Sequence, residues 1–166
     1  MKTATVEQST VISPEQLLEH WQGHRKVTRR VIDAFPEDKL FTYSLGGMRS
    51  MAELTLEILS MTVPGVKGII TGKWNSLEDL TAPENNPPKT KKELLERWDN
   101  ATEELNTLWP QIPPNRFQEI DKAFNMYEGT IYFSLFYFID NEIHHRGQGY
   151  VYLRSLGIEP PAFWDR

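Results

Sequence analysis

Two signals for the start of a helix, each followed by apolar residues at helical spacing, constrain the fold of this chain most strongly. The first is the capping box Ser13-Pro14-Glu15-Gln16, and the second is the box Thr90-Lys91-Lys92-Glu93. After the first box, apolar or neutral residues recur every three or four positions until Pro36. After the second box, the same spacing continues to Trp109-Pro110. No segment alternates convincingly as a β-strand, so these patterns predict a helical protein.

Two more segments carry a helical period. One covers residues 50–64 and is mostly apolar, so we expect it to be buried on more than one side. The other covers residues 129–156. Residues 65–89 and 115–128 are expected to be long connections, the first with a short helix at 76–80. A short first loop predicts that the first two helices are antiparallel neighbours. The sequence therefore predicts an all-α four-helix bundle with long crossover connections.

The composition of the chain excludes several classes of protein. A chain of 166 residues with 39% hydrophobic and 25% charged residues is expected to form a single domain over residues 1–166. The net charge of −5 argues against a protein that grips nucleic acid through phosphates. The lack of cysteine excludes thiolate zinc sites, disulfides and a cysteine nucleophile. Residues 1–11 do not resemble a signal peptide, and the apolar run 131–139 is far shorter than the about 20 residues that span a bilayer. We therefore expect a cytoplasmic protein without a membrane partner.

The last predicted helix contains an unusual polar stretch in its middle. On a helix, Asn141, His145 and Gln148 share one stripe with Phe138 and Tyr152. If the two aromatic residues face the core, the three polar residues between them face it too. Buried polar groups need partners. This stripe therefore predicts a functional site in the core of the bundle.

The first two helices supply further candidates. His20 and His24 are four residues apart and could bind one metal, or His20 is half exposed and His24 is a hydrogen-bonded core histidine. Glu57 lies among apolar residues, so its carboxylate must be paired, protonated or bound to a cation. If the chain turns near residues 40–43, Glu57 and His24 face each other. A buried pair of Glu57 with His24 or with an arginine, and no ligand, is the alternative.

The segment Asn141-Glu142-Ile143-His144-His145-Arg146-Gly147-Gln148 resembles the last-helix signature of the DinB/YfiT-like family. Arg49-Ser50-Met51-Ala52-Glu53-Leu54, followed by Glu57, resembles the second helix of that family. The resemblance implies a four-helix bundle, often dimeric, in which three histidines hold a divalent metal. One histidine comes from the second helix and two come from the last. The corresponding positions here are Glu57, Asn141 and His145, so a carboxylate and an amide replace two of the three imidazoles.

The resemblance implies a metal-dependent enzyme, either a thiol-dependent S-transferase or a hydrolase. A divalent transition metal (Zn, Ni, Mn or Fe) would be held by Glu57 and His145, and the site would be completed by Asn141 or by His24 from the facing first helix. The metal would activate a bound low-molecular-weight thiol or water. Glu57 and His145 would be the catalytic residues, and His20 and Gln148 would contact the substrate or the ligands. The alternative is a non-catalytic bundle that binds a small ligand or a protein partner and keeps a metal-free, hydrogen-bonded polar cluster.

Several residues are expected to lie on the surface. The first helix has a basic face, which we expect to be solvated: Arg25, Lys26, Arg29 and Arg30. Glu142 and Arg146 form an i, i+4 pair that would be an ordinary ion pair if exposed.

The last helix carries aromatic residues on all sides, which predicts burial on several sides and a homodimer contact: Tyr132, Phe133, Phe136, Tyr137 and Phe138.

Overall fold

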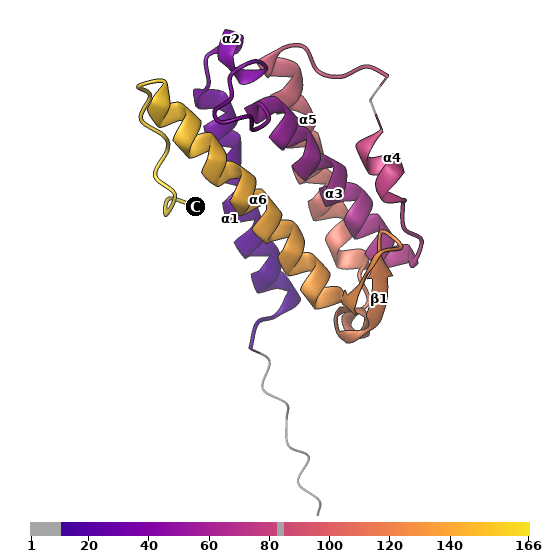
Figure 1. The fold of residues 1–166 in the computed structure, drawn as a ribbon. Coiled ribbons are helices and arrows are strands. Elements are labelled where there is room, and N and C mark those ends of the chain that lie inside the picture. The colour runs from indigo at the N-terminus through magenta and orange to yellow at the C-terminus, as the bar shows by residue number, and fades with distance from the viewer. Residues whose placement is uncertain (1–10, 83–84) are drawn as a thin grey trace, which may run out of the picture.

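Four long helices form the body of the protein in a computed structural model, which describes residues 11–82 and 85–166 (Figure 1). They are α1 (Pro14–Ala34), α3 (Met51–Thr71), α5 (Lys91–Leu108) and α6 (Ile131–Ser155). This confirms the predicted all-α bundle. The polar segment 1–10, for which no signal peptide is expected, lies outside the described residues.

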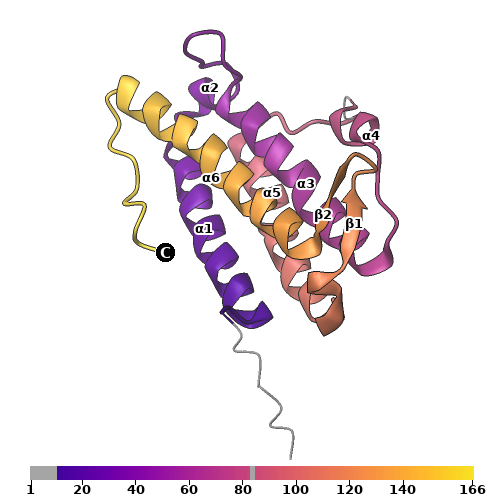
Figure 2. The same cartoon turned by 60° about the horizontal axis from the view of Figure 1, so that its bottom comes forward.

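The remaining elements lie in the connections. Two short helices, α2 (Glu37–Leu40) and α4 (Leu77–Thr81), come before and after α3. Two 3-10 helices follow α5, namely η1 (Trp109–Gln111) and η2 (Pro114–Gln118). An antiparallel hairpin of β1 (Ile120–Ala123) and β2 (Tyr127–Thr130) then leads into α6 (Figure 2). In this hairpin Ala123 pairs with Tyr127.

Both predicted capping boxes are present. The Ser13 hydroxyl accepts from the Gln16 backbone N–H at 3.2 Å, and the Thr90 hydroxyl accepts from Glu93 in the same way. A further box, in which Ser50 and Glu53 cap each other, starts α3. Each box satisfies backbone donors that a helix start leaves without partners, so these three helices begin where their side chains specify.

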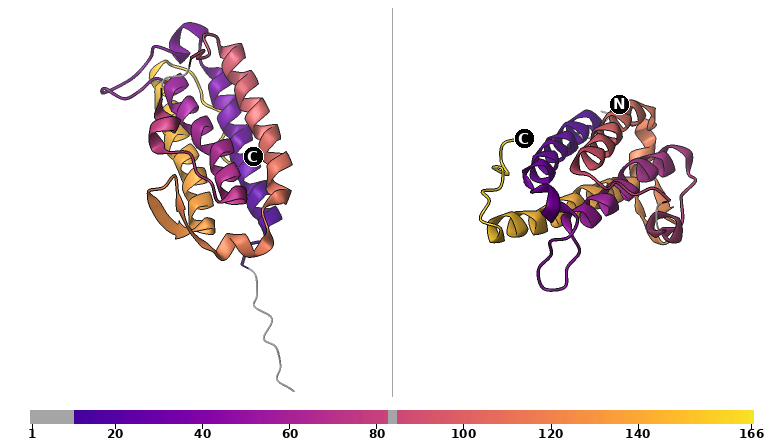
Figure 3. Two further views of the ribbon diagram at one scale, coloured as in Figure 1. Left: turned by 90° about the vertical axis from the view of Figure 1, so that its right-hand side faces the viewer. Right: turned by 90° about the horizontal axis from the view of Figure 1, so that it is seen from above.

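The four long helices pack in a square in which α1 and α3 occupy opposite corners (Figure 3). Each of them packs against α5 and α6 instead. The contacts of Arg29 with Asp99 and of Trp21 with Glu142 are examples on the two sides of α1. The prediction that the first two helices are neighbours was therefore wrong. The connection that contains α2 crosses the end of the bundle, so a short link joins helices on a diagonal.

The helix α3 continues two turns beyond Pro64, where the sequence predicts its end. Gly65 and Gly68 read as loop residues, but each lets an aromatic ring approach the helix. A Cβ at Gly65 would lie 2.7 Å from the Phe138 ring, and one at Gly68 would lie 2.4 Å from the Trp74 ring. Burial of these rings offsets the hydrogen bond that Pro64 removes. The helix ends at Gly72, whose φ of 68° is left-handed.

By length and composition, α3 is the one helix among the described residues that could cross a membrane. Ten of its residues are buried inside the protein. Its apolar character is therefore explained by its packing against α5 and α6.

Residues 115–128, predicted to be a loose connection, instead form η2 and most of the hairpin. The strands have four residues each, which is too short for a clear alternation in the sequence. Phe124 and Asn125, in the turn, have φ values of 52° and 60°. The turn holds the Phe124 side chain at 3% exposure, so the hairpin closes the end of the core.

The core consists of two apolar clusters with a polar layer between them. One cluster lies around Trp21, Ile69 and Phe138, and the other lies around Ile58 and Tyr152. Three of the long helices, α1, α3 and α6, contribute buried polar side chains to the layer between them: His24, Arg25, Thr28, Thr62, Glu142, His145 and Arg146. Arg25 was predicted to be solvated, and Glu142 and Arg146 were considered as an exposed pair. All three are buried, because the diagonal packing turns these faces of α1 and α6 toward each other.

Candidate functional site

The three positions at which the resemblance implies metal ligands, Glu57, Asn141 and His145, lie together between α3 and α6. The Nε2 of His145 lies 2.9 Å from the Oε1 of Glu57. The Nδ2 of Asn141 lies 3.2 Å from both of these atoms. Because a carboxylate oxygen only accepts hydrogen bonds, Nε2 carries a proton and donates to Glu57, as does the Asn141 amide. Two polar side chains of α6 therefore donate to one carboxylate oxygen of α3.

Arg49, just before α3, occupies the other oxygen of the same carboxylate through an ion pair with Oε2. The Arg49 side chain is half exposed, whereas 24% of the Glu57 side chain is exposed. Burial acts to raise the pKa of Glu57, but the hydrogen bonds from His145, Arg49 and Asn141 outweigh burial and hold the pKa below its usual value. Glu57 is therefore ionised at neutral pH, and both of its oxygens have internal partners.

This donor set does not fit the three-imidazole metal centre that the resemblance implies. It contains one imidazole, one carboxylate that already has a guanidinium partner, and one amide. The Asn141 amide points its NH₂ group at Glu57. The Oδ1 of Asn141 and the Nδ1 of His145 are buried and have no hydrogen-bond partner among the described residues. Within residues 11–82 and 85–166, no three His, Asp or Glu side chains gather closely enough to hold a metal ion. A cation at Glu57 would have to displace Arg49 and would have only one imidazole beside it.

His24 belongs to a different cluster, on the α1 side of α6. Its Nδ1 lies 2.9 Å from a guanidinium nitrogen of Arg146, and its Nε2 lies 3.2 Å from the Nε2 of His20. Both ring nitrogens therefore have neighbours other than Glu57. Burial, assisted by the positive charges of Arg146 and Arg166 and by His20, lowers the pKa of His24 to about 3. The expected facing of His24 and Glu57 required adjacent helices, and α1 and α3 are diagonal.

The two remaining predicted contact residues also lie outside the Glu57 cluster. His20 is exposed and touches His24 edge to face. Gln148 is half-buried, and its amide lies 3.0 Å from the Nε2 of the exposed His144. The structure therefore brings together Glu57, Asn141 and His145 and places His24, His20 and Gln148 elsewhere.

The polar layer beside this cluster is a charge network centred on Glu142, whose side chain is fully buried. Its carboxylate accepts from the Thr28 hydroxyl at 2.6 Å and from the Trp21 indole at 3.2 Å. Arg25 lies 3.7 Å away and also stacks over the Trp98 ring at 4.0 Å. Burial raises the pKa of Glu142, although Arg25 and Thr28 act in the opposite direction. This network holds α1, α5 and α6 together.

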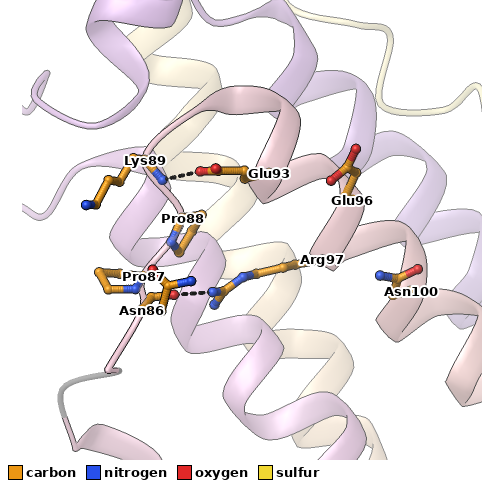
Figure 4. A pocket seen from close by; sticks show the side chains of 8 residues that line it. All are labelled: Asn86, Pro87, Pro88, Lys89, Glu93, Glu96, Arg97 and Asn100. Atoms are coloured by element: carbon orange, nitrogen blue, oxygen red, sulfur yellow. Dashed lines mark hydrogen bonds between the residues drawn. The ribbon is translucent and has the colours of Figure 1, made fainter.

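A polar pocket of about 390 Å³ lies beside α5, at the end of the connection that precedes the helix (Figure 4). Hydrogen bonds between its polar groups join the connection to the helix. The Lys89 backbone N–H donates to Glu93 at 2.7 Å, and Arg97 donates to the Asn86 carbonyl. The pocket contains none of the predicted site residues.

The sequence predicts an arginine as one of the alternative partners of Glu57, but it does not identify that arginine as Arg49. Nothing in the spacing of Arg49 and Glu57 distinguishes this pair from other charges on α3. A general signal existed, since a buried carboxylate on an apolar helix needs a cation. Which cation it has depends on how the chain enters α3.

Comparison with known proteins agrees with the fold. The DinB family model matches residues 1–165. The structure is similar to a DinB-like protein from Bacillus subtilis, with 22% identity and a TM-score of 0.72 over 91% of this chain and 99% of that chain. A DinB-like protein from Bacillus cereus gives 16% identity and a TM-score of 0.70 over 89% and 95%. No curated protein matches the sequence. With its four-helix bundle and a family match over nearly its whole length, this chain belongs to the DinB family.

Proposed function

We propose that this chain is a metal-independent member of the DinB family that acts by binding, and that an Arg49–Glu57 ion pair stands where other members hold a metal. The observation that carries the proposal is the saturation of the Glu57 carboxylate. One oxygen accepts from His145 and Asn141, and the other pairs with Arg49. A guanidinium supplies the positive charge that a buried carboxylate needs, so no metal is required to stabilise the cluster.

A second candidate function is the metal-dependent S-transferase or hydrolase that the family resemblance suggests. It is favoured by the convergence of three polar atoms within 2.9–3.2 Å of one another. That spacing is close to the separation of about 3.3 Å between ligand atoms in a tetrahedral site with metal–ligand bonds of about 2 Å. In this function, Glu57 and His145 would be the protein ligands, and Asn141 would need to turn its carbonyl oxygen toward the metal.

Metal titration distinguishes the two functions. We expect calorimetry to show no saturable uptake of Zn²⁺, Ni²⁺, Mn²⁺ or Fe²⁺ by the wild-type chain at neutral pH. The double variant Glu57→His with Asn141→His restores the three-imidazole set on the same backbone and serves as the matched positive control. It should bind Zn²⁺ with one-to-one stoichiometry. If the wild type binds one equivalent and Glu57→Gln abolishes this uptake without unfolding the chain, the metal-dependent function replaces the proposal, and screening for thiol transfer follows.

We also propose that the chain is a cytoplasmic homodimer. Ile143 at 36% and Val151 at 55% exposure are apolar side chains on the second half of α6, and they support a contact between copies there. Sedimentation equilibrium over a range of protein concentrations tests the dimer, and cell fractionation tests the location. A monomer at all concentrations, or a membrane-bound protein, would contradict this proposal.

A further inference from the structure

A small aromatic cavity lies between the hairpin and the start of α6. Its volume is about 170 Å³, and the surface that lines it is almost entirely apolar. Five of the seven lining residues are aromatic: Phe124, Tyr127, Phe133, Tyr137 and Phe138, with Ala123 and Ser134 completing the wall. No residue of the Glu57 cluster lines it, so the cavity is separate from that site.

Contacts with buried rings behind the lining hold the deep walls of this cavity in place. The rings of Phe124 and Phe138 are 5.8 Å apart and are almost fully buried. Phe124 also meets Trp74 edge to face at 5.4 Å, and the Trp74 indole is anchored by a hydrogen bond to Asp121 at 3.1 Å. The deep walls therefore have little freedom to collapse into the cavity.

The backbone at Phe124 supports the same conclusion. A bulky residue rarely adopts a φ of 52°, and such a conformation persists only where its surroundings over-determine it. Here the strained turn directs a phenyl ring into the wall. Tyr127, Phe133 and Tyr137 are 48–63% exposed, so aromatic side chains also surround the mouth.

We propose that this cavity binds an uncharged, single-ring aromatic molecule, or the aromatic end of a larger one. The volume is close to the about 150 Å³ of an apolar cavity that takes up benzene. Aromatic walls favour an aromatic guest through edge-to-face contacts. A carboxylate or ammonium on the guest would be excluded, because the lining offers it almost no polar partner. This inference does not depend on whether the Glu57 cluster binds a metal.

A titration with toluene tests the proposal. Binding is detected by calorimetry and by shifts of the aromatic NMR signals of the protein. We expect saturable one-to-one binding of toluene and no binding of benzoate at the same concentrations. Ala123→Leu and Ser134→Leu each place a larger side chain into the cavity and should weaken toluene binding by about tenfold or more. Two filling variants are used because either one alone could fail to fold. Ala101→Leu, on α5 and away from this cavity, is the matched control and should bind like the wild type.

Three results would overturn the proposal. The first is the absence of saturable toluene binding by the folded wild type. The second is binding that both filling variants leave unchanged, which would place the toluene elsewhere. The third is a dimer, detected by sedimentation, whose formation excludes toluene, because the natural occupant of the cavity would then be a second copy of the chain.

Discussion

Replacing Gly68 by alanine tests why α3 continues beyond its proline. The new Cβ would lie 2.4 and 2.7 Å from two atoms of the Trp74 ring, about 1 Å inside ordinary contact. The ring cannot move freely, because it donates to Asp121 and packs on Phe124. Overpacking of this kind costs about 1–3 kcal/mol, and a lost hydrogen bond adds about 1 kcal/mol. Alanine offsets about 1 kcal/mol through its higher helix propensity. We therefore expect a net destabilisation of about 1–3 kcal/mol.

Urea denaturation measures this change, and Gly147→Ala is the matched control. Gly147 also lies inside a long helix, but apart from its own turn of helix no described residue lies within 4 Å of the Cβ that alanine would add. The control should therefore raise the free energy of unfolding by about 1 kcal/mol. If Gly68→Ala stabilises the protein as much as Gly147→Ala does, close packing of Trp74 is not the reason for the glycine. Because Trp74 supports a wall of the aromatic cavity, Gly68→Ala should also weaken toluene binding.

Two further predictions concern the polar layer. The pKa of His24 is lowered to about 3 in the folded protein. As the pH falls below about 6.5, His24 is therefore protonated in the unfolded chain while it stays neutral in the folded protein. The wild type should therefore lose up to about 1.4 kcal/mol of stability per pH unit more than His24→Gln between pH 6.5 and 5, and equal slopes in urea denaturation would contradict this. Arg25→Met should destabilise the protein by about 3–5 kcal/mol, because it leaves the buried Glu142 carboxylate 4.0 Å from Arg146 and without its closer cation. Adding Glu142→Met should restore part of that loss, and a double variant no more stable than Arg25→Met would show that Arg25 acts by packing alone.

Local signals in the sequence predicted the helices well where caps and periodicity agree. The boxes at Ser13 and Thr90 mark the starts of α1 and α5 as the structure has them. The prediction failed where tertiary packing decides. Gly65 and Gly68 usually interrupt helices, but here they admit rings from distant segments. The order of helices around the bundle also depends on how the connections cross its ends, and a short loop alone does not determine it.

The candidate site was predicted in part, for a similar reason. Glu57, Asn141 and His145 meet because α3 and α6 are neighbours, and the resemblance identified all three positions. His24 lies with Arg146 because α1 and α3 are diagonal, which no helical spacing reveals. Arg49 lies outside the periodic part of α3, so its ion pair with Glu57 depends on tertiary structure.

In the proposed function, the Arg49–Glu57 ion pair takes the place of the metal that the family resemblance implies. The most direct test is the metal content of untagged protein, purified without chelator and measured by elemental mass spectrometry beside His145→Ala. We expect well under one equivalent of any transition metal in the wild type, with no difference from the variant. Near one equivalent of zinc, nickel, manganese or iron in the wild type, lost in His145→Ala, would contradict the claim.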